Sequence, residues 1–290
     1  MNMRDIDFLI IGATKSATTW LQQSLQGHPE IYMPDPELHY FSREYEKGSS
    51  WYLDQFRPSR LHRIIGEKSN SYMDTPAACG RIRRDLPDVK LIAQLRNPVE
   101  RAYSDYCMLY RRGEVGSDIG QYLDPQVGGG DRLLRGGLYY DQLQAFMDSF
   151  PASRLLVLLY EGILTEPQSQ LNTVARFLGL QSELDVPPVG SKVKDRTQSV
   201  VGPGLRRALA PLKPIVSPFR HAPVLRDLRS LIARPPRYAP LGDDLRKRLI
   251  EFYMPQVEKL GPLVGRDLSV WLADVDPAGG SSKNGRAPGL

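Results

Sequence analysis

The stretch Asp7-Phe-Leu-Ile-Ile-Gly-Ala-Thr-Lys-Ser-Ala-Thr-Thr-Trp-Leu21 decides the fold class of this 290-residue chain. Residues 7–11 contain a continuous apolar run, at 8–11, with aromatic and β-branched side chains, which is typical of a buried strand. Gly12 ends the run, small and hydroxylated residues follow, and apolar side chains then recur at helical spacing over 20–25. The pattern predicts a strand, a polar loop and a helix at the start of the domain.

The same alternation of apolar runs and helical spacing continues along the chain. Short apolar runs predict three further strands, at 64–65, 89–95 and 155–160. Helical spacing and helix boundary residues predict helices over 74–86, after Pro98, and over 138–150, 168–178 and 241–260. Strands that alternate with helices indicate a single α/β domain with a P-loop-like central parallel sheet flanked by helices. We expect this domain to cover 1–276 and the Gly/Ser/Pro-rich tail, 277–290, to be disordered.

Composition excludes several classes of protein. Hydrophobic residues make up 41% and charged residues 24%, which is typical of a globular chain and excludes disorder over the whole length. Two cysteines, Cys79 and Cys107, are too few for a disulfide framework and indicate a reducing, cytoplasmic compartment. The apolar runs are much shorter than the ~18 residues that a membrane span needs, so we expect no transmembrane segment.

The positive charge of the chain is concentrated in one segment. The formal net charge is +5, from 38 basic and 33 acidic side chains. Residues 191–250 alone carry 14 basic and 4 acidic side chains, a net charge of +10, and 8 of the 24 prolines lie within 201–240. A protein that binds nucleic acid would spread its positive charge over a wider surface, so we expect no nucleic-acid partner.

The loop after the first strand has the properties of an anion site. It consists of small and hydroxylated residues around one cation: Gly12, Ala13, Thr14, Lys15, Ser16, Ala17, Thr18 and Thr19. The N–H groups and the positive dipole end of the following helix would face a bound phosphate. The loop lacks the second glycine and the Gly-Lys-Ser/Thr ending of a Walker A motif, which argues against magnesium-dependent NTP chemistry. An ordinary polar turn between strand and helix is the alternative.

Four stretches of the sequence together resemble the sulfotransferases that depend on 3′-phosphoadenosine-5′-phosphosulfate (PAPS), in particular the bacterial and heparan-sulfate-type branch. The first stretch is the loop just described, followed by Trp20-Leu21, which is similar to the family's 5′-phosphosulfate loop. The others are Pro36-Glu-Leu-His-Tyr-Phe41, Gly66-Glu-Lys-Ser-Asn-Ser-Tyr72 and Leu95-Arg-Asn-Pro-Val-Glu-Arg-Ala-Tyr-Ser104, similar to K-E-x-H-[YF]-F, G-E-K-[ST]-P-x-Y and R-[ND]-P-x-x-R-x-x-S. Weaker agreement extends the resemblance to about residues 5–272.

The resemblance implies transfer of a sulfuryl group from PAPS to an acceptor by in-line displacement, with 3′,5′-phosphoadenosine as the second product. Lys15 would stabilise charge on the bridging oxygen and the 5′-phosphate. Fixed cations and N–H donors can suffice for this transfer, and the sequence contains no motif with metal-ligand spacing, so we expect no metal.

The resemblance also assigns the acid–base residues. Glu37 would be the general base, and the adjacent nucleotide anion would raise its affinity for a proton. On an extended backbone His39 would share a face with Glu37 and could orient the acceptor or share the base role, although a packed histidine is the alternative. Lys68 matches a family lysine that reaches the sulfuryl group or the acceptor. Two departures from the family pattern stand out, because Pro36 replaces a lysine and Asn70 replaces a proline.

The fourth stretch is assigned to the 3′-phosphate. Arg96 follows a strand and precedes a helix, so its guanidinium could form a charge-assisted fork to that phosphate. Ser104, just over two helical turns later, could donate its hydroxyl to the same group. Lys192, Lys194 and Arg196 match loosely a basic family loop that closes over the nucleotide, and a solvated charged loop is the alternative. Glu67 is expected to pair structurally rather than to act as a base.

The acceptor is the least determined partner. A small molecule, a glycan or an amphipathic natural product fits the resemblance, with a hydroxyl rather than an amine as the attacking group. We expect the basic segment 191–250 to be mobile and to lie beside the acceptor entrance, where peripheral contact with a membrane surface is also open. The oligomeric state is not readable from the sequence. Two other functions compete, a kinase-like P-loop enzyme and a non-catalytic protein that binds anionic surfaces.

Overall fold

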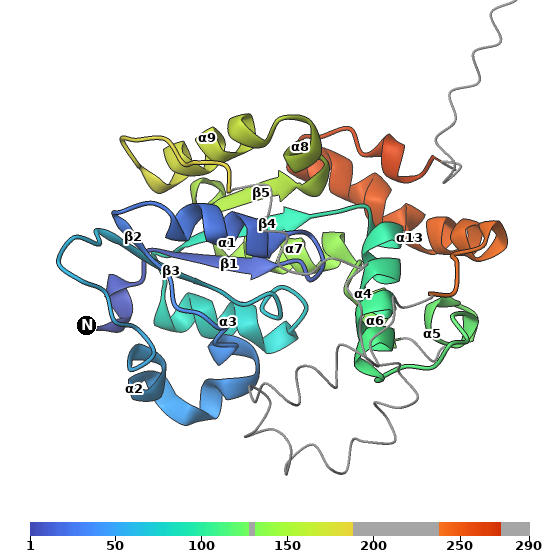
Figure 1. Ribbon diagram of the computed structural model, residues 1–290, viewed down its shortest axis with the longest axis horizontal. Helices are drawn as coiled ribbons and strands as arrows, with labels where there is room; N and C mark the ends of the chain where they lie inside the picture. Colours follow the sequence, from blue (N-terminus) through green and yellow to red (C-terminus); the bar gives the residue numbers. More distant parts are fainter. Residues whose placement is uncertain (128–130, 188–237, 274–290) are drawn as a thin grey trace, which may run out of the picture.

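A single parallel sheet of five strands forms the centre of the protein (Figure 1). The computed structural model describes residues 1–127, 131–187 and 238–273. The strand order is β2-β3-β1-β4-β5, with these bounds: β1 Phe8–Gly12, β2 Ile31–Tyr32, β3 Ile64–Lys68, β4 Lys90–Leu95 and β5 Leu155–Leu159. The fold class predicted from the alternating pattern is confirmed.

Both faces of the sheet are buried. Phe8 and Ile10 of β1 belong to one apolar cluster, whereas Leu9 and Ile11 belong to the other. All four side chains are inaccessible to solvent. A parallel sheet that is covered on both sides needs apolar residues at consecutive positions, which explains why the run at 7–11 does not alternate with polar residues.

Helices cover the two faces in separate sets. On one face lie α1 (Thr18–Gln26) and α9 (Pro167–Leu178). Along the chain, the short helix α8 (Tyr160–Thr165) connects β5 to α9. The other face packs against α3 (Pro76–Asp85), α4 (Pro98–Arg112), α7 (Tyr139–Ser149) and α13 (Asp243–Val264). Figure 1 shows α9 and α3 on opposite sides of the sheet. The remaining helical segments are short: Met3–Asp5, Tyr40–Glu44, Tyr45–Lys47, α2 (Gly48–Leu53), α5 (Gly120–Leu123), α6 (Asp131–Arg135), Ala152–Arg154 and Ser269–Trp271.

Helix α4 begins directly after β4, and its ends follow the sequence signals. The side chain of Asn97 accepts hydrogen bonds from the N–H groups of Val99 and Glu100, and Pro98 occupies the first helical position. Gly113 ends the helix in the left-handed conformation that a helix C-terminus favours. The backbone N–H of Asn97 also donates to Glu161 at 3.1 Å, so β4, α4 and α8 meet at one point.

Strand β3 is longer than the sequence indicates. The apolar pair at 64–65 predicts a strand that ends at Gly66, but β3 continues through Gly66 to Lys68. A Cβ at Gly66 would overlap the ring of Phe8, so glycine is present because the neighbouring strand leaves no room for a side chain. The expected end at Gly66 was therefore wrong, and the extra residues carry Glu67 and Lys68 to the sheet edge.

The C-terminal helix closes the core. The helical spacing of apolar residues over 241–260 predicts one helix. The observed helix α13 continues to Val264 even though it contains Pro255 and Pro262. Its first two turns belong to the segment 191–250, and Leu249 there is fully buried. Residues 188–237 of that segment and the tail from 274 lie outside the described residues. Within the described part of the chain, no helix is long and apolar enough to cross a membrane.

Gly66→Ala should lower the free energy of unfolding by about 1–3 kcal/mol, because the added Cβ must displace the buried ring of Phe8. Gly80→Ala is the matched control. Gly80 lies in α3 with open space at its Cβ position, so alanine there should stabilise the protein by up to about 1 kcal/mol. Urea titration followed by circular dichroism measures both changes. A Gly66→Ala protein as stable as the wild type would show that the sheet tolerates a side chain at this position.

Candidate functional site

The loops that follow three neighbouring strands form the candidate site. β1 lies between β3 and β4, and all three strands are parallel, so their carboxyl ends meet at one edge of the sheet. In open α/β sheets, ligands bind in the crevice outside these carboxyl ends. The loop 13–17 follows β1, the loop 69–75 follows β3, and Arg96 and Asn97 follow β4.

The loop after β1 is held so that helix α1 presents its N-terminus. The carbonyl oxygen of Lys15 accepts a hydrogen bond from Arg96 Nη1 at 3.2 Å, and that of Ser16 accepts one from Gln94 Nε2. Ala17 has a left-handed backbone with φ 61°, and α1 begins at the next residue, Thr18. The first N–H groups of a helix have no acceptor within it and carry partial positive charge, so this arrangement suits an anion.

Gly12 packs closely against the loop that follows β3. A Cβ at Gly12 would lie 2.9 Å from the Cβ of Met73 and 3.3 Å from the carbonyl oxygen of Asn70. Gly12 is therefore required by the close approach of the loop that follows β3. The next residue, Ala13, donates its N–H to the carbonyl of Gln94 at 2.8 Å, which fixes the start of the loop.

Glu37 lies beside this loop and accepts several hydrogen bonds. Lys68 Nζ lies 3.0 Å from Glu37 Oε1 and 3.1 Å from the hydroxyl oxygen of Thr19. The side-chain amide of Asn70 donates to Oε1 at 3.3 Å, and the backbone N–H of Asn70 donates to Oε2 at 3.1 Å. Lys68 is only 3% exposed, whereas Glu37 is 24% exposed. The carboxylate is thus reachable from solvent while the lysine that pairs with it is not.

His39 is oriented by a chain of hydroxyl groups. Ser42 donates to the carbonyl of His39 at 3.1 Å, and its oxygen lies 2.7 Å from the hydroxyl of Ser71, which lies 2.8 Å from His39 Nδ1. With the Ser42 proton committed to that carbonyl, Ser71 donates to Ser42 and Nδ1–H donates to Ser71. Burial lowers the pKa of His39 despite the nearby Glu37 carboxylate. A neutral His39 in this tautomer presents a bare Nε2, which lies 3.8 Å from Glu37 Oε2.

The backbone at His39 differs from the expectation. An extended backbone would place Glu37 and His39 on one face, but His39 has φ 53°, in the left-handed region. The helical segment Tyr40–Glu44 starts directly after it, and this reversal of the chain requires the unusual angle. The two side chains meet nevertheless, because the chain turns back on itself at this position.

Glu67 is a buried carboxyl group surrounded by hydroxyls. Tyr72 and Tyr52 donate to its Oε1, Tyr52 at 3.3 Å, and Ser69 donates to Oε2 at 2.8 Å. Burial raises the pKa of Glu67 to about 7, although these hydrogen bonds lower it. Ser69 also accepts the N–H of His39 at 2.8 Å, so Glu67 supports the backbone next to the site. The expectation of a structural role holds, with hydroxyl groups as its partners.

The structure describes some of the remaining predicted site residues but not all of them. The guanidinium of Arg96 lies 4.5 Å from the ring centre of Tyr160, in addition to its bond to the loop. Ser104 lies in α4 and is 5% exposed. Lys192, Lys194 and Arg196 lie outside the described residues. Of the predicted residues, the structure brings together the loop residues, Glu37, His39, Lys68 and Arg96.

The sequence alone does not indicate the residues that hold Glu37 and His39. Asn70, which contacts Glu37, stands out only as a departure from the family pattern, and no motif assigns a role to Ser71 or Ser42, which orient His39. All three are polar residues close to the end of a strand or the start of a helix, and Asn70 and Ser71 directly follow β3. Polar residues at the carboxyl end of a parallel strand are the signal that could have identified them.

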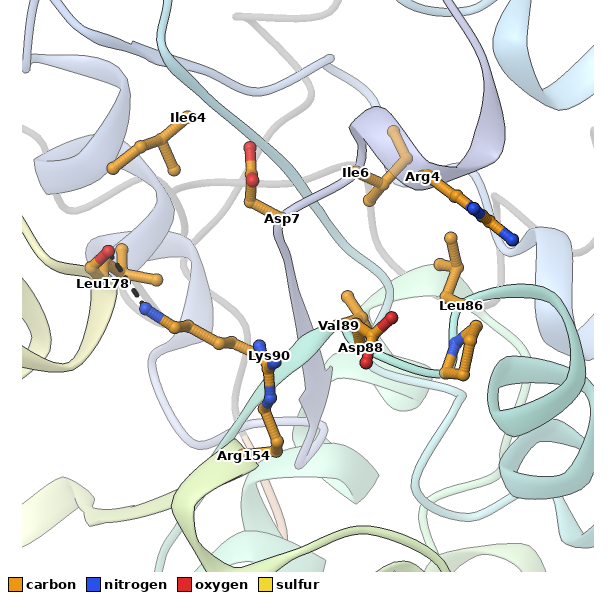
Figure 2. A pocket seen from close by; sticks show the side chains of 11 residues that line it. Arg4, Ile6, Asp7, Ile64, Leu86, Asp88, Val89, Lys90, Arg154 and Leu178 are labelled. Atoms are coloured by element: carbon orange, nitrogen blue, oxygen red, sulfur yellow. Dashed lines mark hydrogen bonds between the residues drawn. The ribbon is translucent and has the colours of Figure 1, made fainter.

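A separate cavity of about 360 Å³ lies at the opposite, amino edge of the sheet (Figure 2). Asp7, Lys90 and Arg154, which stand at or just before the starts of β1, β4 and β5, are among the residues that line it. Lys90 donates to the carbonyl of Leu178 at 3.1 Å, as Figure 2 shows. This cavity contains none of the residues of the candidate site. Within the described ranges, no three His, Cys, Asp or Glu side chains are grouped so that they could hold a metal ion.

The parallel sheet, the loop suited to an anion and the carboxylate beside it are typical of P-loop-like α/β proteins, a class in which phosphorylated ligands bind at the carboxyl edge of the sheet. The comparison with known families is more specific. Residues 5–199, more than half of the chain, match the family model described as a sulfotransferase domain, and the chain belongs to this family.

Individual relatives agree with the family assignment. The chain is 34% identical over 178 residues to heparan sulfate glucosamine 3-O-sulfotransferase 3B1 of Mus musculus, covering 60% of this chain and 46% of that protein. It is 33% identical over 199 residues to the bifunctional heparan sulfate N-deacetylase/N-sulfotransferase 1 of Mus musculus, covering 61% and 22%. This chain thus spans less than half the length of either relative. The crystal structure of a sulfotransferase from Alicyclobacillus acidocaldarius has the same fold, with a TM-score of 0.68 at 24% identity, covering 92% of this chain and 99% of that one.

The buried carboxyl of Glu67 should make stability depend on pH. Because the pKa is raised from 4.5 to about 7, the folded state binds more protons than the unfolded state between these values. Stability should therefore fall as pH rises from 4.5 to 7. Over this window the wild type should lose roughly 3 kcal/mol more than Glu67→Gln, measured by urea unfolding at each pH. Parallel pH curves for the two proteins would contradict this assignment.

Proposed function

We propose that this chain transfers a sulfuryl group from PAPS to a hydroxyl group of a small-molecule, glycan or amphipathic natural-product acceptor. The bridge made by Lys68 carries the proposal, since its Nζ contacts both Glu37 and Thr19. It joins a carboxylate suited to accept a proton to a loop suited to hold a phosphate. Transfer from an anionic donor to a hydroxyl requires both groups side by side.

The residues present fit the donor. Its 5′ end needs N–H donors and cations, which the first turn of α1 and Lys15 supply. Arg96 stands where β4 ends and α4 begins, and we assign it with Ser104 to the 3′-phosphate. Lys192, Lys194 and Arg196 are assigned to the same nucleotide by family resemblance alone. PAPS supplies the sulfuryl group and leaves as 3′,5′-phosphoadenosine.

Glu37 takes the proton of the acceptor hydroxyl as its oxygen bonds to sulfur. The bond between sulfur and the bridging phosphate oxygen breaks at the same time, and Lys15 stabilises the charge that develops on that oxygen. Lys68, held between Glu37 and Thr19, keeps the base beside the loop and supplies positive charge to the group in transit. His39, neutral and with a bare Nε2, is assigned to orient the acceptor hydroxyl.

Several observations bear on the acceptor and on the alternatives. The names of the relatives refer to O- and N-sulfation of heparan sulfate, which supports a glycan as the first acceptor class to test. Cys79 and Cys107 are both buried and form no disulfide, which supports a reducing, cytoplasmic compartment. A protein that only binds anionic surfaces would have no need for a buried lysine paired with a carboxylate beside the loop, since such a pair is costly to bury.

The site assignment predicts which cations hold the nucleotide. Lys15→Ala and Arg96→Ala should each weaken the binding of 3′,5′-phosphoadenosine by about tenfold or more, because each removes a charged donor to a phosphate. Isothermal titration calorimetry measures the affinity. Arg176→Ala is the control, since this arginine lies exposed on α9 and should leave affinity unchanged. Unchanged binding in both test variants would refute the site, and magnesium-dependent ATP binding would favour a kinase.

The base assignment predicts a loss of turnover with little loss of binding. Glu37→Gln should lower kcat by roughly 10²–10⁴-fold, because it removes the proton acceptor. Its affinity for 3′,5′-phosphoadenosine should change by less than about threefold, as expected for an interaction that acts in the transition state. Release of the nucleotide with a panel of glycan, phenol and lipid-like acceptors measures kcat, and Glu258→Gln on the exposed side of α13 is the control. Full turnover in Glu37→Gln would move the base role to His39.

A further inference from the structure

Asn70 makes three contacts that connect the loop after β1 to Glu37. Its backbone N–H and its side-chain amide donate to the two different oxygens of Glu37, at 3.1 Å and 3.3 Å. Its side-chain oxygen accepts the hydroxyl proton of Thr18 at 2.7 Å. No other residue in the described part of the chain is recorded with a hydrogen bond to each oxygen of this carboxylate.

The orientation of the Asn70 amide follows from its neighbours. A carboxylate only accepts hydrogen bonds, so the group that faces Glu37 must be the NH₂ group. The carbonyl oxygen must then face Thr18, whose hydroxyl can donate to it. Both ends of the amide are satisfied in this orientation, whereas the flipped amide would place two oxygens against each other.

The backbone contact depends on the residue type as well. The sulfotransferase pattern has proline at this position, and a proline has no N–H to donate. In this chain the N–H of residue 70 donates to Glu37 Oε2, the oxygen that also faces His39 Nε2 at 3.8 Å. The departure from proline to asparagine therefore adds two donors to the carboxylate, one from the backbone and one from the side chain.

We propose that Asn70 is a positioning residue which fixes the orientation of the Glu37 carboxylate and ties it to Thr18 at the phosphate end of the site. The inference rests on the proposed function, in which Glu37 is the base. Two N–H donors on different oxygens restrict the rotation of the carboxylate. Thr18 lies in the first turn of α1, so a ligand that moves this turn also moves the amide that holds the base.

Two substitutions separate positioning from packing. Asn70→Ala keeps the backbone N–H and removes the amide, so kcat should fall by about 10- to 100-fold with KM for PAPS changed by less than about threefold. Asn70→Asp has nearly the same shape but places a second carboxylate against Glu37, so its kcat should fall further than that of Asn70→Ala. A packing role predicts the opposite order, because the aspartate fills the same volume.

A second asparagine supplies matched controls. Asn172 lies on α9, where its side-chain oxygen accepts a hydrogen bond from Gln168 at 2.9 Å. Asn172→Ala and Asn172→Asp should leave both kcat and KM unchanged.

A measurement without turnover separates this inference from the proposed function. A crystal structure of each variant shows the Glu37 side chain directly, which should leave its wild-type rotamer in Asn70→Ala and turn away from residue 70 in Asn70→Asp. Such a change in a protein that transfers no sulfuryl group would refute the function and keep the contact. An unchanged Glu37 rotamer in both variants, or a smaller loss of kcat in Asn70→Asp than in Asn70→Ala, would overturn the role of Asn70. Circular dichroism melting of each variant confirms that the measured protein is folded.

Discussion

The ion pair between Lys68 and Glu37 is the interaction on which the candidate site depends. An ammonium group that is 3% exposed is costly unless a carboxylate and further hydrogen-bond partners surround it. Glu37 supplies the charge and Thr19 supplies a hydroxyl oxygen, so the chain at 37, the end of β3 and the start of α1 are held together. The contacts of Lys68 thus fix the distance between Glu37 and the first turn of α1.

Two carboxyl groups near this pair have opposite environments. Glu37 faces N–H and ammonium donors and is partly exposed. Glu67 is fully buried, and burial raises its pKa to about 7 although the hydroxyl groups around it lower it. Consecutive residues of a strand face opposite sides, so Lys68 points to the site while Glu67 points into the core. The extension of β3 past Gly66 creates this division, and glycine is needed at 66 because the ring of Phe8 leaves no room for a side chain.

The sequence predicts more of the fold than of the candidate site. Continuous apolar runs indicated β1, β3, β4 and β5 but not the two-residue β2, because a parallel sheet buries both faces. Pro98 indicated where α4 starts. The family motifs identified Glu37 and Lys68 but not the residues that contact them. Asn70 is 33 residues from Glu37 and 52 residues from Thr18 in the sequence, so no local pattern could predict these contacts. Those contacts exist because β3 lies next to β1, and strand order is a property of the whole sheet that no local pattern encodes.

The contacts also distinguish the two oxygens of Glu37 within the proposed reaction. Thr18 and Thr19 are neighbours in the first turn of α1, and they bind Asn70 and Lys68, which both contact Oε1. Oε1 is thus committed to the protein, whereas Oε2 has the Asn70 N–H and faces Nε2 of a neutral His39. Two acceptor atoms 3.8 Å apart repel each other weakly and share a need for a donor. In the proposed reaction an acceptor hydroxyl would meet that need, and with Glu37 as the base Oε2 would be the oxygen that takes its proton.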